Sequence, residues 1–267
     1  MTVLGLDLND FDKLYEWVVN GTLIAFRFPS NCNFWSDEAA ARGNDYADKL
    51  VNYLEGVVES RKANRGNDFI SRMLNYSDQH PGEFTNGDLI KIIVTHINGG
   101  FHESAFQVLG EGIRLLISTG QYHQLVEDPS KATACVDEIL RYHAAAPMGA
   151  RRANADVTLA GKSIKKDDFV FLNFGAAQRD PKIYENARSF NINRSGVANG
   201  DLSFGYGPHV CTGRAQVKLL SSTFFAEVAK SYPKLQIETW PANCSMSLRY
   251  QPREDVVLLE SLPLKLS

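Results

Sequence analysis

The sequence predicts a mainly α-helical protein with small β-sheets, formed as a single domain over residues 1–267. Apolar residues recur at helical spacing through the first two thirds of the chain, and short alternating segments typical of β-strands follow them. At roughly 150 residues per domain, this length allows one large domain or two small ones. We expect one, because no repeat, low-complexity linker or break in composition divides the chain.

Composition excludes several classes of protein. Hydrophobic residues make up 44% of the chain and charged residues 22%, which is enough apolar content to bury a core and to exclude general disorder. The 28 Lys and Arg residues against 31 Asp and Glu residues give a net charge of -3. We therefore expect no nucleic-acid partner, because nucleic-acid binders carry a basic surface.

Apolar runs, the N-terminus and the cysteines predict where the protein is located. The longest apolar runs are four residues, whereas a membrane span needs about 20, so we expect no membrane span. The N-terminus lacks the charged segment of a secretory signal. The four cysteines lie far apart without a C-x-x-C pair, which indicates free thiols in a reducing compartment and no zinc site. These features predict a cytoplasmic protein.

Helical segments come first along the chain. The spacing of apolar residues predicts helices over residues 10–28, 37–61, 68–74, 85–118 and 130–143. Thr85 is the expected N-cap of the fourth segment, with Asp88 three residues later as the acid of a capping box. That segment also contains Gly99 and Gly100, which favour a bend or the close approach of a bulky group.

The remainder of the chain is less regular. Alternating residues predict strands over residues 156–159, 163–164, 169–174 and 256–259. A turn-rich stretch over residues 178–200 leads to a glycine-rich loop at residues 204–213, and a helix to about Ser231 follows the loop.

The loop carries the clearest chemical signal. It reads F-G-Y-G-P-H-V-C-T-G, and its glycines permit backbone conformations that a β-carbon forbids. Cys211 lies just before the predicted helix, where the positive end of the helix dipole stabilises a thiolate. A sulfur in this position is suited to act as a nucleophile or as a metal ligand.

This loop resembles the haem-thiolate signature of the cytochrome P450 family. The six fixed positions of F-G-x-G-x-H-x-C-x-G are matched at Phe204, Gly205, Gly207, His209, Cys211 and Gly213. The resemblance implies haem b as cofactor, Cys211 as the thiolate ligand of its iron, and His209 and Arg151 or Arg152 as contacts of the haem propionates. A thiolate ligand pushes electron density onto iron and favours O–O cleavage.

Two further motifs follow in the family's order. Glu138 and Arg141 resemble the E-x-x-R pair of helix K, and residues at this spacing share one helix face. The stretch that begins at Gln178 resembles the family's meander. At the site of the family's third arginine this chain has Ser189, with Arg188 beside it.

The middle of the fourth predicted helix resembles the oxygen-binding segment A-G-x-[DE]-T of helix I, whose acid and alcohol deliver protons. In one register Glu103 and Ser104 are the acid and the alcohol, and Phe101 replaces the glycine. In the other register the two glycines form the Ala-Gly pair, His102 is the acid and Glu103 the alcohol. We prefer the first because it keeps the relay, and we assign Glu103 and Ser104 as catalytic residues. A one-residue π-bulge would reconcile the two.

The resemblance covers the whole chain but only about the C-terminal two thirds of a usual bacterial member. It therefore implies an N-terminally truncated P450-like fold, from helices E and F to helix L and the Cys loop. The missing parts would leave an apolar face open, and such faces find partners. We expect a homodimer, a complementing chain or a rebuilt pocket.

The resemblance implies a haem-thiolate oxidoreductase of the monooxygenase type. Its substrate would be a small organic molecule of bacterial secondary metabolism, and its electrons would come from a ferredoxin-type redox partner. The altered helix I segment leaves open a haem-thiolate isomerase, cyclase or peroxygenase. The missing parts leave open a scaffold that has lost haem and works by side-chain catalysis or by partner binding.

Overall fold

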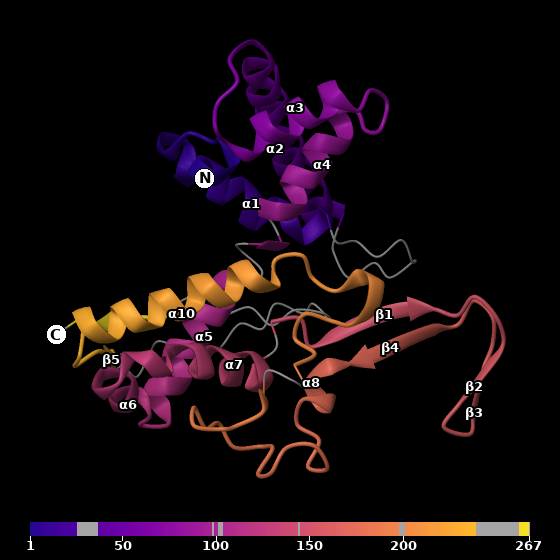
Figure 1. Ribbon diagram of the computed structural model, residues 1–267. Coiled ribbons are helices and arrows are strands. Elements are labelled where there is room, and N and C mark those ends of the chain that lie inside the picture. The colour runs from indigo at the N-terminus through magenta and orange to yellow at the C-terminus, as the bar shows by residue number, and fades with distance from the viewer. Residues whose placement is uncertain are drawn as a thin grey trace. The chain divides into compact units, whose positions relative to one another are not determined.

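The computed structural model of the chain describes residues 1–25, 37–97, 99–100, 104–143, 145–197, 201–238 and 262–266. The chain folds into two compact units, which we call unit 1 (Met1–His102) and unit 2 (Glu103–Ser267). The predicted fold class is confirmed, because the described residues form mainly helices, accompanied by three two-stranded sheets (Figure 1). No helix in these ranges is both long and apolar enough to cross a membrane.

Unit 1 is helical. After two short 3-10 turns, Thr2–Leu4 and Leu8–Asp10, it contains helices α1 (Phe11–Ala25), α2 (Asp37–Ala63), α3 (Phe69–Gln79) and α4 (Asn86–Ile97). Leu50, Leu54 and Val58 recur every fourth residue along α2, and all three are buried. The buried cluster of unit 1 comprises Leu4, Leu6, Leu14, Val18, Leu50, Leu54, Val58, Ile70, Leu74, Leu89, Ile90 and Ile93.

Side-chain caps set where two of these helices begin. Asp68 accepts a hydrogen bond from the backbone N–H of Ser71 (2.8 Å) and starts α3, which continues five residues beyond the predicted end. The predicted capping box at α4 is confirmed. Thr85 Oγ1 accepts from the N–H of Asp88 (3.2 Å), and Asp88 Oδ2 accepts from the N–H of Thr85 (3.0 Å).

The segment predicted as one helix over residues 85–118 contains two helices. Helix α4 ends at Ile97, and α5 (Ala105–Ser118) starts within unit 2. Between them, Gly99 and Gly100 have π-helical hydrogen bonding. Each glycine costs about 1 kcal/mol of helix stability relative to alanine, which explains why the regular helix ends here. The four other residues of this junction, 98 and 101–103, lie outside the described ranges.

Unit 2 packs helices around a second core. Its helices are α5, α6 (Tyr122–Glu127), α7 (Ala132–Tyr142), α8 (Phe174–Ala177) and α10 (Arg214–Ser231), with 3-10 turns at Pro129–Lys131 and Gly207–His209. One face of α10 is buried, at Val217, Ser221, Phe225 and Ala229. The core cluster comprises Val108, Ile113, Leu115, Leu116, Tyr122, Leu125, Ala132, Cys135, Val136, Ile139, Leu140, Phe190, Ile192, Phe225, Ala229 and Leu235.

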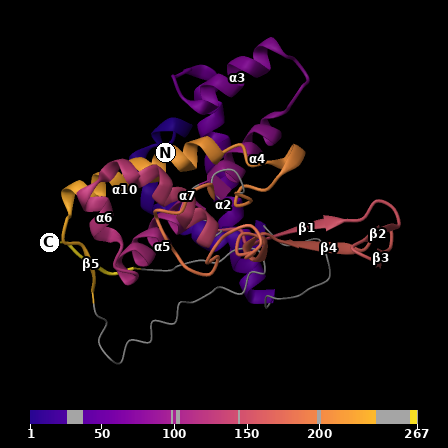
Figure 2. The ribbon, with the colours of Figure 1, turned by 60° about the horizontal axis from the view of Figure 1, so that its bottom comes forward.

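The sheets of unit 2 are small. Strand β1 (Met148–Arg152) pairs antiparallel with β4 (Phe169–Asn173), β2 (Val157–Leu159) with β3 (Lys162–Ile164), and β5 (Gln236–Ile237) with β6 (Leu264–Lys265). We call residues 148–173 the ribbon; it extends away from the helices of unit 2 in both views (Figures 1 and 2). The strands predicted around 157, 163 and 169 are confirmed, and the one predicted over residues 256–259 lies outside the described ranges.

Candidate functional site

The six motif residues lie in one loop that leads into α10. The backbone N–H of Cys211 donates to the carbonyl of Phe204 (2.9 Å), and the N–H of Val210 donates to the carbonyl of Gly207 (3.0 Å). Gly205 and Gly207 have φ angles of +69° and +81°, a region that residues with a β-carbon rarely adopt. These glycines therefore let the chain fold back, so that Cys211 is tied to the start of its own loop.

The thiol of Cys211 is available at the surface of the described structure. Cys211 is a free, exposed cysteine just before Gly213, the N-cap of α10. Cys135, by contrast, is fully buried, and burial together with the nearby charge of Glu138 raises the pKa of its thiol to about 12. The other two cysteines, Cys32 and Cys244, lie outside the described ranges. Of the two described thiols, only that of Cys211 can reach a ligand.

The loop presents apolar and cationic side chains together. Tyr206 is 84% exposed and Val210 is 43% exposed, and His209 beside them is exposed as well. The ring of Phe204 is half-buried, with Arg214 Cζ and Lys218 Nζ each 6.0 Å from its centroid. The exposed side chains of Tyr206 and Val210 form an apolar surface on this loop.

A buried glutamine holds the start of the loop. Gln178 is fully buried, its Nε2 donates to Ser203 Oγ (2.9 Å), and its Oε1 accepts from the N–H of Leu202 (3.2 Å). Ser203 Oγ in turn donates to the carbonyl of Leu140 on α7 (2.8 Å). The chain that enters the loop is therefore hydrogen-bonded to α7 and to the end of α8.

The predicted site residues Arg151, Ser104 and Glu103 lie outside the loop of Cys211. Arg151 is exposed on β1, opposite Val170 of β4, and its guanidinium donates to the carbonyl of Ala150 (2.8 Å). Ser104 immediately precedes α5 and is partly buried, and its carbonyl accepts from the N–H of Val108 (3.0 Å). Glu103 lies outside the described ranges.

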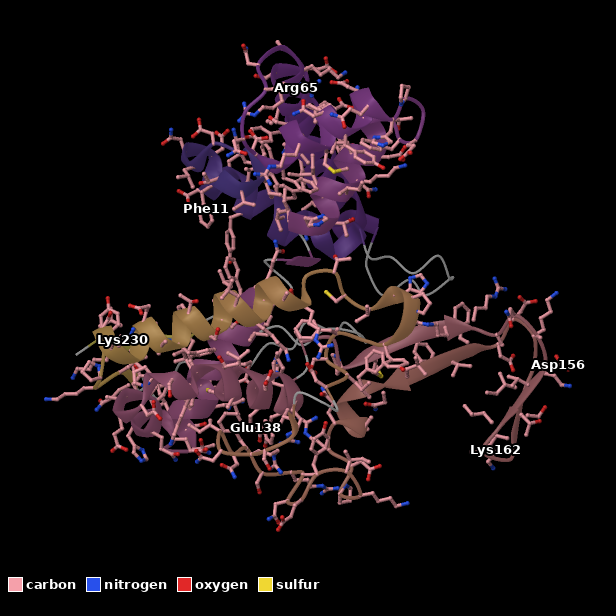
Figure 3. All side chains as sticks on the ribbon, in the orientation of Figure 1. Phe11, Arg65, Glu138, Asp156, Lys162 and Lys230 are labelled. Atoms are coloured by element: carbon pink, nitrogen blue, oxygen red, sulfur yellow. The ribbon has the colours of Figure 1, made fainter. Side chains whose placement is uncertain are left out.

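The predicted pair on α7 forms a buried lock. Glu138 and Arg141 are both fully buried, and two hydrogen bonds join their side chains at 2.7 and 2.9 Å. Arg141 Nη1 also donates to the carbonyls of Gln178 and Ala187, both at 2.8 Å. The pair thus fastens α7 to the irregular chain that precedes the loop. Figure 3 labels Glu138 at its place on α7.

A second arginine, which the sequence motifs did not reveal, completes the lock. Arg194 Nε lies 3.1 Å from Glu138 Oε2, and its Nη2 donates to the carbonyl of Ser189 (2.9 Å). Arg188, next to the position where the motif expected an arginine, is exposed. Residues 192 and 193 form a turn, so no helix or strand periodicity in the sequence identifies Arg194.

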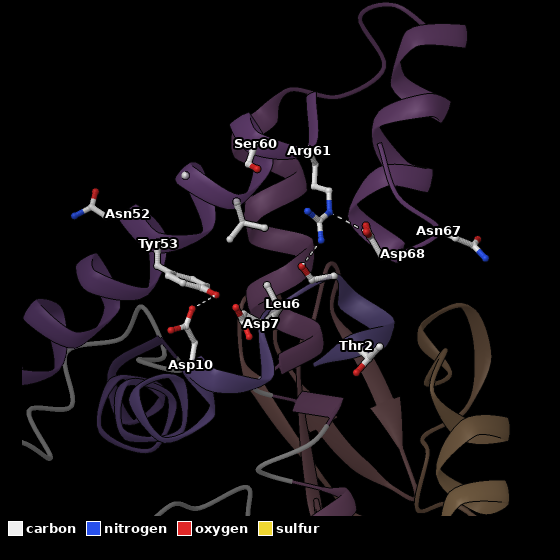
Figure 4. Close-up of a pocket in the computed structure, with 13 residues that line it drawn as sticks. Thr2, Leu6, Asp7, Asp10, Asn52, Tyr53, Ser60, Arg61, Asn67 and Asp68 are labelled. Atoms are coloured by element: carbon white, nitrogen blue, oxygen red, sulfur yellow. Dashed lines mark hydrogen bonds and ion pairs between the residues drawn. The ribbon is translucent and has the colours of Figure 1, made fainter. Parts of the chain in front are cut away.

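A separate cavity of about 850 Å³ lies within unit 1 (Figure 4). Its charged and phenolic side chains bind one another: Arg61 Nε donates to Asp68 Oδ2, and Tyr53 Oη donates to Asp10 Oδ2, both at 2.8 Å. Burial, together with this hydrogen bond to Asp10, raises the pKa of Tyr53 to about 12. The residues that line this cavity include none of the predicted site residues.

The side chains that can act as metal ligands indicate which kind of metal site the chain could form. In the described part of the chain no three His, Cys, Asp or Glu side chains gather where they could hold a metal ion. Cys211 offers one exposed thiol as a metal ligand. A porphyrin supplies four nitrogens, so the donor set at the loop fits a haem.

Comparisons with known proteins agree with this chemistry. The family model described as Cytochrome P450 matches residues 130–232, which include α7 and the Cys loop. The chain is 32% identical over 72% of its length to the polyketide biosynthesis cytochrome P450 PksS of Bacillus subtilis (strain 168). It is 28% identical over 98% of its length to the biotin biosynthesis cytochrome P450 of the same organism.

Solved structures show the same relationship. The crystal structure of P450BioI in complex with an acyl carrier protein carrying hexadec-9Z-enoic acid matches all of this chain, with a TM-score of 0.84 and 27% identity. Cytochromes P450 bind haem b through a cysteine thiolate. The chain spans 46% and 62% of the lengths of the two curated relatives, and 64% of the chain in that crystal structure.

Proposed function

We propose that this chain, which is similar to bacterial cytochromes P450, binds haem b through Cys211 and acts as a monooxygenase-type oxidoreductase on a small organic substrate. The observation that carries this proposal is the Cys loop. An exposed thiol is tied back to Phe204 by its own backbone N–H and lies just before α10. This arrangement suits a thiolate that binds a metal.

Several side chains would hold the cofactor. Cys211 would bind the iron, and the exposed side chains of His209 and Arg151 would donate hydrogen bonds to its propionates. Tyr206 and Val210 would cover part of the porphyrin with apolar surface. When bound through a thiolate, haem supplies the activation of O2 for oxidation of an organic substrate.

The start of α5 would handle protons. Ser104 immediately precedes this helix, and Glu103 is adjacent to it in the sequence. A carboxylic acid and a hydroxyl in succession can pass a proton between water and a reacting group. We assign the pair this role, with Glu103 as the acid and Ser104 as the group that passes the proton on.

The partners follow from the relatives. A monooxygenase of this type takes electrons from a separate carrier, and we propose a ferredoxin-type protein. The named roles of the relatives, in polyketide and biotin biosynthesis, favour an organic substrate from a biosynthetic pathway. The complex of one related structure with an acyl carrier protein favours a carrier-bound acyl chain as a second candidate substrate.

Exposed apolar side chains support a second proposal. Tyr206 and Val210 of the loop and Leu219 and Leu220 of α10 are exposed, and we propose that a second copy or a complementing chain covers them. A homodimer and a complementing chain are distinguished by the mass of the haem-bound species.

The first experiment is the reduced CO difference spectrum of the full chain, expressed with added haem. The parent is expected to give the thiolate-type Soret band. Cys211→Ala is expected to lose that band while its far-UV circular dichroism is unchanged, because the exposed thiol supports no core. Cys135→Ala is the matched control: it removes a buried thiol and is expected to keep the band.

Alkylation gives an independent readout. In the haem-free chain iodoacetamide is expected to modify Cys211 and leave Cys135 unmodified, because Cys211 is exposed and Cys135 is buried. Bound haem is expected to protect Cys211, as judged by mass spectrometry of its peptide. Identical spectra for the parent and Cys211→Ala would exclude Cys211 as the ligand. A parent that takes up no haem would overturn the proposed function and favour the haem-free scaffold.

A further inference from the structure

We propose that Lys218 is a positioning residue for Cys211: it fastens the base of the Cys loop to α7 and α10, and so sets how firmly the thiol is held for a metal. The expected effect of Lys218 on haem binding rests on the proposed function. The positioning itself is a property of the haem-free chain. Lys218 lies on α10, seven residues after Cys211.

Lys218 forms ion pairs in two directions. Its Nζ lies 2.7 Å from Asp137 Oδ1 on α7 and 3.4 Å from Asp201 Oδ2, just before the loop. The lysine side chain is only 21% exposed, and that of Asp137 only 14%. Ion pairs shielded from water to this extent resist screening by salt better than surface pairs do. One ammonium group therefore joins α7, α10 and the chain that enters the loop.

Asp201 depends on this lysine for its counter-charge. Its side chain is fully buried, and its Oδ1 accepts from the N–H of Ser203 (2.8 Å). Its Oδ2 is buried and has no hydrogen-bond partner in the described structure, and the ammonium group of Lys218 forms an ion pair with this atom. A buried carboxylate without a cation is strongly unfavourable, so Lys218 and Asp201 hold each other in place.

The same ammonium group also lies over the loop itself. Lys218 Nζ is 6.0 Å from the centroid of the Phe204 ring, and the carbonyl of Phe204 accepts the N–H of Cys211 at 2.9 Å. The ring and the carbonyl belong to one residue. A cation that fixes the ring therefore also fixes the acceptor that orients the backbone of Cys211.

The test compares variants that separate positioning from folding. Lys218→Met/Asp201→Asn removes the ammonium group together with the fully buried carboxylate of Asp201, whereas Asp137, whose side chain is 14% exposed, keeps contact with water. The amide oxygen at position 201 still accepts from the N–H of Ser203. Lys218→Arg keeps the cation. Lys230→Met is the matched control, because Lys230 lies on the same helix in an exposed pair with Glu227. Each full-length chain is measured by hydrogen exchange without haem and by its CO spectrum with haem.

The double variant is expected to exchange the Cys211 amide at least about threefold faster than the parent, with exchange in the centres of α5 and α7 unchanged. With haem, it is expected to hold a smaller thiolate-ligated fraction, whereas Lys218→Arg and Lys230→Met match the parent in both measurements. Parent-like exchange at Cys211 in the double variant would overturn the inference, and so would an equal rise in α5 and α7. A parent that takes up no haem would overturn the proposed function, and the exchange result would still decide the role of Lys218.

Discussion

At the scale of single residues, the buried carboxylate of Glu138 joins two arginines to the irregular chain near the loop. It binds Arg141 and Arg194, and its Oε1 also accepts from the N–H of Asn191 (2.8 Å). Both arginines also donate hydrogen bonds to backbone carbonyls of the irregular chain between α8 and the loop. These charged hydrogen bonds hold the segment between α8 and the loop in place, because it forms few of the regular backbone hydrogen bonds of a helix or strand.

Arg194→Met is expected to lower the free energy of unfolding by about 3 kcal/mol, the low end of the range for breaking a buried ion pair. The variant leaves Glu138 with a single arginine and releases the carbonyls that Arg194 holds. The control is Arg188→Met, which changes an exposed arginine in the same stretch and is expected to stay within about 0.5 kcal/mol of the parent. Urea unfolding measures both. Equal losses in the two variants would show that Arg194 contributes no more than surface charge.

Sequence reasoning predicted correctly the structure that depends on nearby residues. Residues 204–213 form a loop that leads into α10, and Glu138 pairs with Arg141 on one face of α7. Arg194 and Lys218 act across 56 and 81 positions of the chain. Such contacts depend on which elements pack together, and no local pattern specifies that packing.

At the scale of elements, close approach of three helices forms the centre of unit 2. Gly112 on α5 faces Phe225 of α10 and Ile139 of α7. A β-carbon at Gly112 would lie 2.4 Å from Phe225 Cζ and 2.7 Å from Ile139 Cδ1. Both neighbours are fully buried, so they have little room to move.

Gly112→Ala is expected to destabilise the chain, because overpacking costs about 1–3 kcal/mol and offsets the gain of about 1 kcal/mol in helix propensity. Adding Phe225→Leu is expected to recover part of the loss by making space. The control is Gly56→Ala on α2, where nothing lies within 4 Å of the added carbon, so only the stabilising term remains. Thermal unfolding follows all three. A rise in Tm for Gly112→Ala equal to that for Gly56→Ala would exclude the close contact.

The elements show where periodicity is informative. Helices of eleven or more residues, such as α2 and α7, repeat their apolar pattern several times and were predicted. Strands β5 and β6 contain two residues each, which is too short for an alternation of apolar and polar residues to be recognised. The six-residue helix α6 was missed for the same reason.

At the scale of the whole molecule, both units contain titratable groups whose pKa is shifted from its ordinary value. In unit 2, Nε2 of His143 is buried without a hydrogen-bond partner in the described structure. Burial lowers the pKa of this histidine below its ordinary value of 6.5, and the positive charges of Arg114 and Arg179 act in the same direction, while Glu111 opposes them. In unit 1, the hydrogen bonds from Thr85 lower the pKa of Asp88 to about 2.

These shifts predict that acid destabilises the chain in two stages. Below pH 6.5 the unfolded chain protonates His143 and the folded chain does not, so stability falls as the pH drops from 6.5 towards the lowered pKa. The carboxylates with lowered pKa, including Asp88, lose their contribution only below their ordinary value of 3.8.

His143→Gln is expected to remove the first stage and leave the second unchanged. Urea unfolding at about pH 7.5, about pH 5.5 and about pH 3 separates the two windows. A parent-like fall between the two higher pH values in His143→Gln would assign the first stage to another group.

The turn at the end of the ribbon offers a place to modify the chain. Ala160 and Gly161 join β2 to β3 with φ angles of +48° and +76°, as in the two-residue turns of tight hairpins. Every residue of β2 is exposed, and Asp156 and Lys162 lie at the far end of the ribbon from the helices (Figure 3). An epitope or fluorophore-binding peptide inserted between Ala160 and Gly161 would therefore leave both cores intact, and would give a handle for imaging or capture of the chain in cells.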